Sequence, residues 1–176
     1  MSNSKKPRIL VVANQKGGVG KTTTTVNLAA SLAVAEKRVL VLDFDPQGNA
    51  SSALGVDRST VSGSANIYHA LIGEVKLSEV VRPTEIDHLF IAPAGTDLSG
   101  AEIELVSAFA RESKMKMMIA EVKSQYDYIL IDCPPALGML SMNSLAAADF
   151  LLITLQCEYM ALEGLGQILR NVERLK

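Results

Sequence analysis

One stretch, NQKGGVGKTT at residues 14–23, constrains the fold and the chemistry of this chain more than any other feature. It follows a short apolar run, residues 9–13, and overlaps the start of a helix-compatible stretch, residues 23–35. A strand, a glycine-rich turn and a helix form the context in which such a motif binds phosphate. Backbone N–H groups turn inward around the anion, and the first helical turn adds unpaired N–H groups and its positive dipole end. The sequence therefore predicts a nucleotide-binding protein.

The residues of this loop have separate expected roles. We expect Gly17, Gly18 and Gly20 to adopt positive φ and to direct N–H groups at phosphate. Lys21 supplies a positive charge for the β- and γ-phosphates, and the Thr22 hydroxyl is a ligand for Mg²⁺. The predicted cofactors are ATP or ADP with Mg²⁺, and the residues expected to bind them are Lys16, Gly17, Gly18, Val19, Gly20, Lys21, Thr22 and Thr23.

The start of the loop departs from the ordinary phosphate-binding pattern G-x-x-x-x-G-K-[ST]. Gln15 stands where that pattern has its first glycine, and Lys16 follows. A second lysine inside the loop is typical of the deviant Walker A pattern, KGGxGK[ST]. The ordinary alternative is an exposed lysine on a turn. Because Lys16 lies between Gln15 and Gly17 in this loop, we expect its side chain to reach phosphate.

Composition limits the class of protein. A length of 176 residues suffices for one domain with a buried core, which we expect over residues 8–176 behind a polar tail, residues 1–7. The net charge of −2 gives no overall attraction to nucleic acid, so contact with DNA needs a local basic patch. Cys133 and Cys157 lack metal-ligand spacing, and we expect both to be small buried residues in a reducing cytoplasm. Residues 145–155 are apolar but too short to span a membrane, so a soluble cytoplasmic protein is expected.

Apolar runs alternate with helix-compatible stretches along the chain. Strands are expected at residues 9–13, 38–43, 88–92, 128–132 and 150–155, and helices at residues 23–35, 66–72, 98–123, 139–147 and 163–175. Residues 48–63, rich in Ser, Gly and Ala, are expected to form a loop. This alternation predicts the α/β class, with a doubly wound, mostly parallel sheet of the P-loop NTPase type and helices on both faces.

Acidic residues mark the ends of two expected strands. Asp43 closes residues 38–43, Asp45 follows it, and Asp132 closes residues 128–132. Ligands of open α/β sheets bind beyond the carboxyl ends of the strands, so these carboxylates are expected to converge on the phosphate loop. Asp132 has the form of a Walker B aspartate that holds Mg²⁺, and the turn at Asp45 can present a carboxylate to water. Helix capping or turn formation is the structural alternative for each aspartate.

Five patterns occur in order along the chain: the loop KGGVGKTT from Lys16, DFDPQGNA from Asp43, AEIEL from Ala101, DYILIDCPP from Asp127 and QCEYMALEGL from Gln156. Together they resemble the ParA/Soj family of chromosome- and plasmid-partitioning ATPases, and the similarity runs from Arg8 to the last residue. The resemblance implies a hydrolase that converts ATP and water to ADP and phosphate as a slow switch. It implies Lys16, Lys21 and Asp45 as catalytic residues, and Thr22, Asp43 and Asp132 at the metal.

The resemblance also implies partners and states. Two subunits would enclose two ATP molecules, with Lys16 reaching the phosphates of the partner subunit and Lys21 its own. The ATP-bound homodimer would bind DNA without sequence preference, which implies association with the nucleoid. A ParB-like protein would stimulate hydrolysis, and the ADP form would return to the monomer. Charge on the γ-phosphate would be neutralised by both lysines and Mg²⁺.

Members of this family continue beyond the position of residue 176, so we expect a domain that is incomplete at its C-terminus. The remaining part resembles the region that contacts adenine and much of the DNA-binding surface. We therefore expect DNA binding and ATP turnover to be weakened or lost in this chain, and strand 150–155 to have an unpaired edge. The alternatives are a non-hydrolysing nucleotide-binding regulator, a gene fragment, or another deviant Walker A ATPase such as a division-site selector. A division-site selector should end in a basic amphipathic membrane helix, whereas residues 163–175 read better as a packed crossover helix.

Overall fold

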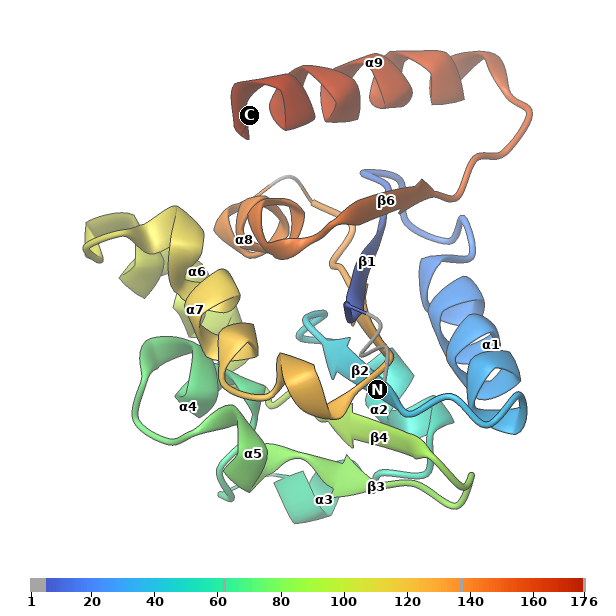
Figure 1. Cartoon of the computed structure of the whole chain (residues 1–176). Helices are drawn as coiled ribbons and strands as arrows, with labels where there is room; N and C mark the ends of the chain where they lie inside the picture. Colours follow the sequence, from blue (N-terminus) through green and yellow to red (C-terminus); the bar gives the residue numbers. More distant parts are fainter. Residues whose placement is uncertain (1–5, 62, 137, 176) are drawn as a thin grey trace.

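The computed structural model describes residues 6–61, 63–136 and 138–175. Within them, six strands form one sheet in the order β3-β4-β2-β5-β1-β6 (Figure 1). The bounds are β1 (Arg8–Ala13), β2 (Val39–Asp43), β3 (Arg82–Pro83), β4 (Leu89–Ala92), β5 (Tyr128–Asp132) and β6 (Phe150–Ile153). The short β3 runs antiparallel to β4, and the other neighbours pair in parallel. The predicted α/β class with a mostly parallel sheet is confirmed.

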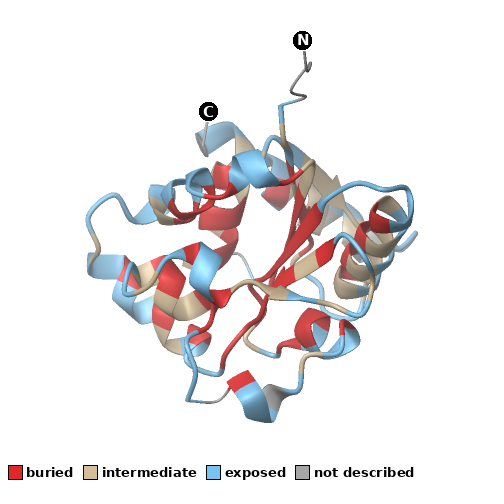
Figure 2. Cartoon of the chain, turned by 60° about the horizontal axis from the view of Figure 1, so that its bottom comes forward, coloured by how far each residue is buried: buried red, intermediate tan, exposed pale blue. Residues whose placement is uncertain are grey.

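The helices lie in two layers against this sheet. Figure 1 shows α1 (Lys21–Val34) on one side of the strands, and Figure 2 shows the buried strands between helices with exposed outer surfaces. The opposite side is covered by α4 (Ile67–Ile72), α6 (Leu98–Ser107), α7 (Lys114–Ala120) and α8 (Met139–Ala147). This arrangement gives the sheet a helical layer on each face, as the sequence predicted.

The aliphatic run of β2 explains why the sheet is covered on both faces. Alternate residues of a strand point to opposite faces. Val39 and Val41 pack in the cluster that contains residues of α1, whereas Leu40 and Leu42 pack with the larger cluster on the other side. All five residues of β2 are buried. A strand without polar alternation is therefore buried on both sides, as is typical of parallel sheets.

The register of the central strands brings the acidic ends together. Asp43 of β2 pairs with Asp132 of β5, and Asp132 pairs with Val12 of β1. The loop of residues 14–20 begins directly after β1, so it lies at the same edge of the sheet. This edge is the carboxyl end of the parallel strands, where ligands of such folds bind.

Two predicted segments differ from the structure. Residues 48–63 are not simply a loop, because they contain α2 (Asn49–Ala53) and α3 (Arg58–Val61). Residues 98–123 do not form one helix, because the chain leaves α6 after Ser107 with an extended Ala108 (φ −73°, ψ 139°), and Ala110 then has a left-handed φ of 51°. The chain resumes in a 3₁₀ turn, η1 (Arg111–Ser113), before α7. A left-handed residue cannot continue a right-handed helix, so the polar-apolar pattern spans two elements.

Other boundaries also needed correction. A short helix, α5 (Leu77–Val80), and the strand β3 were not predicted, and a second 3₁₀ turn, η2 (Lys123–Gln125), precedes β5. The last helix, α9 (Tyr159–Leu175), begins before the predicted residue 163. Of the predicted polar tail, residues 1–5 lie outside the described residues.

The last strand and helix form one side of the molecule. β6 lies at the edge of the sheet beside β1, as expected for residues 150–155, although the strand itself ends at Ile153. Figure 1 shows α9 beyond β6 and α8. Ile168 of α9 is fully buried, whereas its neighbour Leu169 is 48% exposed. None of the described helices is long and apolar enough to cross a membrane.

Candidate functional site

The phosphate loop joins β1 to α1. Gly18 and Gly20 have φ values of 73° and 83°, which favour glycine, and Gly20 is the residue that precedes the helix. Gly17, which can also adopt positive φ, does not do so here. Among the described residues, no side chain caps the start of α1 and no acidic residue lies in its first turn. The first N–H groups of α1 are therefore free of a competing side chain and can bind an anion.

Lys21 lies inside this loop. The residue is only 7% exposed, and its Nζ donates a hydrogen bond to the carbonyl oxygen of Lys16 at 3.0 Å. Burial lowers the pKa of Lys21, while the carboxylates of Asp132 and Asp45 oppose that shift. The ammonium group thus lies in the loop and donates to one backbone carbonyl, which leaves N–H groups that can bind phosphate oxygens.

Asp132 connects the end of β5 to the start of α1. Thr22 Oγ1 donates a hydrogen bond to Asp132 Oδ2 at 2.7 Å, and Thr25 Oγ1 donates one to Asp132 Oδ1 at 3.0 Å. Burial raises the pKa of Asp132 to about 6, and the two hydroxyl groups limit the rise. Thr25 was not predicted as a site residue. Its position three residues after Thr22, on the same helical face, is the signal that could have identified it.

The donor set at this point fits a magnesium–nucleotide complex. Mg²⁺ prefers oxygen ligands and is commonly held by one or two carboxylates together with phosphate groups and water. Thr22 and Asp132 already meet at 2.7 Å beside the phosphate loop. Among the described residues, no group of three or more His, Cys, Asp or Glu residues could hold a metal by itself. The arrangement therefore suits a metal that arrives with phosphate.

The carboxylate of Asp43 is hydrogen-bonded to Ser51 of α2 and to the backbone of Asp45. Its Oδ2 accepts hydrogen bonds from the backbone N–H and the hydroxyl of Ser51, both at 2.7 Å, and its Oδ1 accepts one from Asp45 N at 3.2 Å. Burial raises the pKa of Asp43 to about 7, and the bonds from Ser51 oppose the rise. This geometry ties β2 to α2, the capping role that was the structural alternative. Contact between Asp43 and Mg²⁺ stays a prediction.

Replacing Ser51 with Ala is expected to reduce the free energy of unfolding by about 2–3 kcal/mol. The hydroxyl of Ser51 bonds to Asp43 and also accepts the backbone N–H of Ala94 at 3.1 Å, so both buried groups lose a partner. Urea denaturation measures the change, with Ser52→Ala on the exposed side of α2 as the matched control.

The effect of Ser51→Ala should grow with pH. The pKa of Asp43 is about 7 in the folded protein against an ordinary value of 3.8, so ionisation of Asp43 lowers stability as pH rises towards 7. Without the hydroxyl of Ser51 the pKa of Asp43 rises further, and the loss should be larger at about pH 8 than at about pH 5. An equal loss for Ser51→Ala and Ser52→Ala would contradict the buried network.

Asp45 faces the phosphate loop across a pocket. The carboxylate oxygen Oδ1 accepts the backbone N–H of Gln47 at 2.9 Å, and the Asp45 carbonyl accepts that of Gly48 at 2.8 Å, which fixes a tight turn. The pocket has a volume of about 470 Å³. Its lining residues are Gly17, Gly18, Gly20, Lys21, Thr22, Thr23, Asp45, Gln47, Asn49 and Pro135. It thus joins the phosphate loop to the segments that follow β2 and β5.

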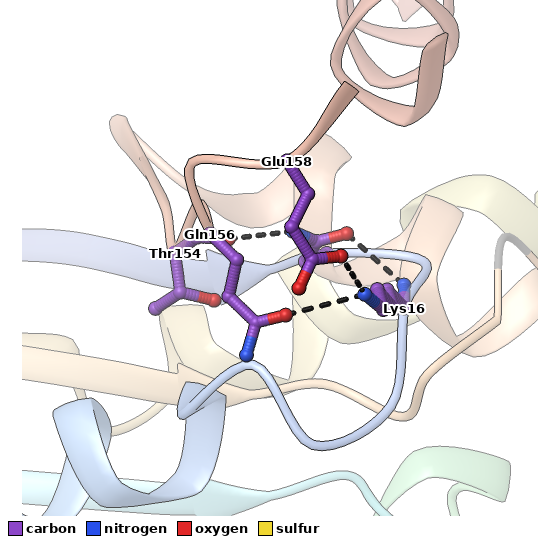
Figure 3. Close-up of polar contacts among 5 residues, drawn as sticks. Lys16, Thr154, Gln156 and Glu158 are labelled. Carbon is purple, nitrogen blue, oxygen red and sulfur yellow. Dashed lines mark hydrogen bonds and ion pairs between the residues drawn. The ribbon is translucent and has the colours of Figure 1, made fainter. Parts of the chain in front are cut away.

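Lys16 does not reach this pocket. Figure 3 shows its side chain pointing to the segment after β6, where Nζ lies 2.6 Å from Glu158 Oε2 and 3.2 Å from Gln156 Oε1. Asn14 joins the same two segments, because its Nδ2 donates to the carbonyl of Thr154 at 2.5 Å and its Oδ1 accepts Lys16 N at 3.0 Å. Within this subunit the Lys16 ammonium therefore pairs with Glu158, and contact between Lys16 and phosphate stays a prediction. Since both ion-pair partners are about half exposed, the pair is worth at most about 1 kcal/mol and is easily exchanged.

The two cysteines differ in exposure. Cys133, next to Asp132, is buried as predicted, and burial raises the pKa of its thiol to about 12. Cys157, which lies between Gln156 and Glu158, is exposed, so the prediction that both cysteines are buried was wrong for this residue. β6 lies at the edge of the sheet and its strand ends at Ile153, which leaves this segment on the surface.

Comparison with known proteins gives consistent results. A family model described as an AAA domain matches residues 7–176. The chain is 52% identical over 169 residues to the chromosome partitioning protein ParA of Myxococcus xanthus, covering 96% of this chain and 59% of that protein. It is 49% identical over 165 residues to the sporulation initiation inhibitor protein Soj of Bacillus subtilis, covering 94% of this chain and 64% of that protein. The chain thus spans less than two thirds of the length of both curated relatives.

A solved structure matches the fold equally well. Cobyrinic acid a,c-diamide synthase from Mycobacterium smegmatis, with bound ADP and magnesium, superposes with a TM-score of 0.90 at 40% identity. The match covers 96% of this chain and 68% of that chain. The two folds are therefore closely similar over nearly the whole of this chain.

Proposed function

This chain belongs to the ParA/Soj family of partitioning ATPases, and from that premise we propose that it binds Mg-ATP and hydrolyses it to ADP and phosphate as the switch of a DNA-segregation system. One observation carries the proposal: the buried Lys21 and the Thr22–Asp132 hydrogen bond lie together at one phosphate-loop pocket. Relatives of this chain support the same reading, because one solved structure contains ADP and magnesium.

Different residues of this chain have different roles in the proposed ATP site. The N–H groups of the loop and of the first turn of α1, with the ammonium of Lys21, bind the β- and γ-phosphates. Thr22 and Asp132 would hold Mg²⁺, and the bound ion would supply positive charge beside the phosphates. Asp45, across the pocket, orients a water in line with the γ-phosphate. The position of Asp45 favours a hydrolysing enzyme over a regulator that only binds nucleotide.

The switch requires a second subunit. In the ATP state Lys16 leaves Glu158 and reaches the phosphates of the partner subunit, which closes a homodimer. That dimer binds DNA without sequence preference, and a ParB-like protein stimulates hydrolysis and release. The net charge of −2 places DNA contact on a local basic patch, with affinity that falls steeply with salt.

Replacing Lys16 with Ala is expected to remove ATP-dependent dimerisation while nucleotide affinity changes by less than about twofold. The physical reason is that Lys16 points away from the phosphate pocket of its own subunit and pairs with Glu158 instead. Light scattering with Mg-ATP measures the dimer. Glu158→Gln is the matched variant, because it weakens the ion pair but keeps Lys16, and it should dimerise at least as well as the unaltered chain. A Lys16→Ala chain that still dimerises would reduce Lys16 to a surface lysine.

A further inference from the structure

The loop between β5 and α8 borders the phosphate pocket, and a side chain from another helix holds its far end. Pro135 of this loop lines the pocket. α8 begins after Gly138, and among the described residues no side chain of its own start caps it. Instead the carboxylate of Glu102, from α6, accepts the backbone N–H of Met139 at 3.2 Å and that of Leu140 at 3.3 Å. Both carboxylate oxygens are used, so the contact is bidentate.

Gly138 is the residue that lets this carboxylate approach. A Cβ at Gly138 would overlap both carboxylate oxygens of Glu102, so the Glu102 side chain would have to move away. The backbone of Gly138, with φ of −83° and ψ of −168°, is one that any residue adopts. Conformation therefore does not require glycine at this position, and the missing Cβ is what leaves room for the carboxylate of Glu102. Glu102 of the AEIEL pattern thus lies directly against Gly138, although the two residues are far apart in the sequence.

The other end of the loop is fixed to the nucleotide site. Asp132, which precedes it, accepts hydrogen bonds from Thr22 and Thr25 of α1. Inside the loop, the carbonyl of Ala136 accepts the hydroxyl of Ser141 from α8. Movement at the start of α8 would thus be passed to the wall of the phosphate pocket. A negative charge at a helix start is also favourable, because it meets unpaired N–H groups and the positive dipole end.

We propose that Glu102 is a positioning residue for ATP hydrolysis, because it holds the start of α8 and thereby fixes the loop that carries Pro135 against the phosphate loop. The inference rests on the proposed function. Lys21 and the glycines bind phosphates that ADP and ATP share, whereas the loop after β5 shapes the wall of the pocket. Loss of Glu102 should therefore slow turnover more than it weakens nucleotide binding.

A double-mutant cycle tests this inference. Glu102→Ala is expected to lower kcat about fivefold to tenfold with KM changed by less than about twofold. Gly138→Ala, which expels the carboxylate, should give a similar loss, and the double variant should be no worse than Glu102→Ala alone. Glu102→Gln keeps one acceptor for α8 and should recover part of the rate. Glu104→Ala, on the exposed face of the same helix, is the matched control and should keep the rate of the unaltered chain.

Hydrogen exchange of residues 138–142 provides a readout that does not depend on nucleotide. Exchange there should increase in Glu102→Ala and Gly138→Ala but not in Glu104→Ala. Unchanged turnover in Glu102→Ala, or losses that add in the double variant, would overturn the inference while ATP hydrolysis by the unaltered chain stands. Failure of the unaltered chain to bind or hydrolyse ATP would overturn the proposed function and the inference with it.

Discussion

Replacing Lys21 with Ala is expected to weaken the binding of ADP and of ATP together, each by about 3 kcal/mol or roughly 100-fold. Lys21 is a buried residue of the phosphate loop, 7% exposed, and its ammonium group donates a hydrogen bond to the carbonyl of Lys16. Because the β-phosphate that we propose Lys21 binds is present in both nucleotides, both affinities should fall by a similar factor. Titration with a fluorescent ADP and competition by ATP measure the two affinities.

The control for this variant is Lys37→Ala. Lys37 is an exposed lysine just before β2 and lies outside the residues that line the phosphate pocket. Its removal changes the net charge equally and should leave both affinities within about twofold. Unchanged ADP affinity in Lys21→Ala would show that the loop does not bind the β-phosphate through this side chain.

Replacing Asp45 with Ala is expected to lower ATP turnover by about 100-fold or more while ATP affinity changes by less than about threefold. Asp45 lines the phosphate pocket opposite the glycine loop, where its carboxylate can orient a water. The phosphate cradle of Gly18, Gly20 and Lys21 is untouched by the substitution. Single-turnover release of phosphate measures the chemical step, and nucleotide titration measures binding.

Two further variants separate the charge of Asp45 from its role in the turn. Asp45→Asn keeps an oxygen that can accept the N–H of Gln47, so the turn should remain while turnover falls as in Asp45→Ala. Asp87→Ala, an exposed aspartate before β4, serves as the control for loss of charge. Full turnover in Asp45→Asn would assign Asp45 to the turn alone.

The parts of the site that the sequence predicted are those set by local spacing. The loop follows a strand and precedes a helix, so Gly18, Gly20, Lys21 and Thr22 occupy their places through contacts close in sequence. Asp132 was also predictable, because a parallel strand delivers its last residue to the edge where the loop lies. The mostly parallel sheet followed from the aliphatic runs in the same way.

The parts that could not be predicted depend on contacts between distant residues. The ion pair of Lys16 with Glu158 and the capping of α8 by Glu102 join residues from separate elements. Hydrophobic periodicity in the sequence does not predict such contacts. The hydrogen bonds from Ser51 to Asp43 likewise depend on the short helix α2. That helix lies in a segment whose small polar residues predicted a loop. These partners come together only in the folded chain, so the secondary-structure propensity of each segment does not predict them.

The most direct test of the central claim is a calorimetric titration of the unaltered chain with ADP, first with Mg²⁺ and then with EDTA. The geometry of Lys21, Thr22 and Asp132 predicts one saturable site per chain with Mg²⁺ and an affinity at least about tenfold lower without it. Absence of binding, or binding that EDTA leaves unchanged, would contradict the assignment of this pocket to a magnesium nucleotide.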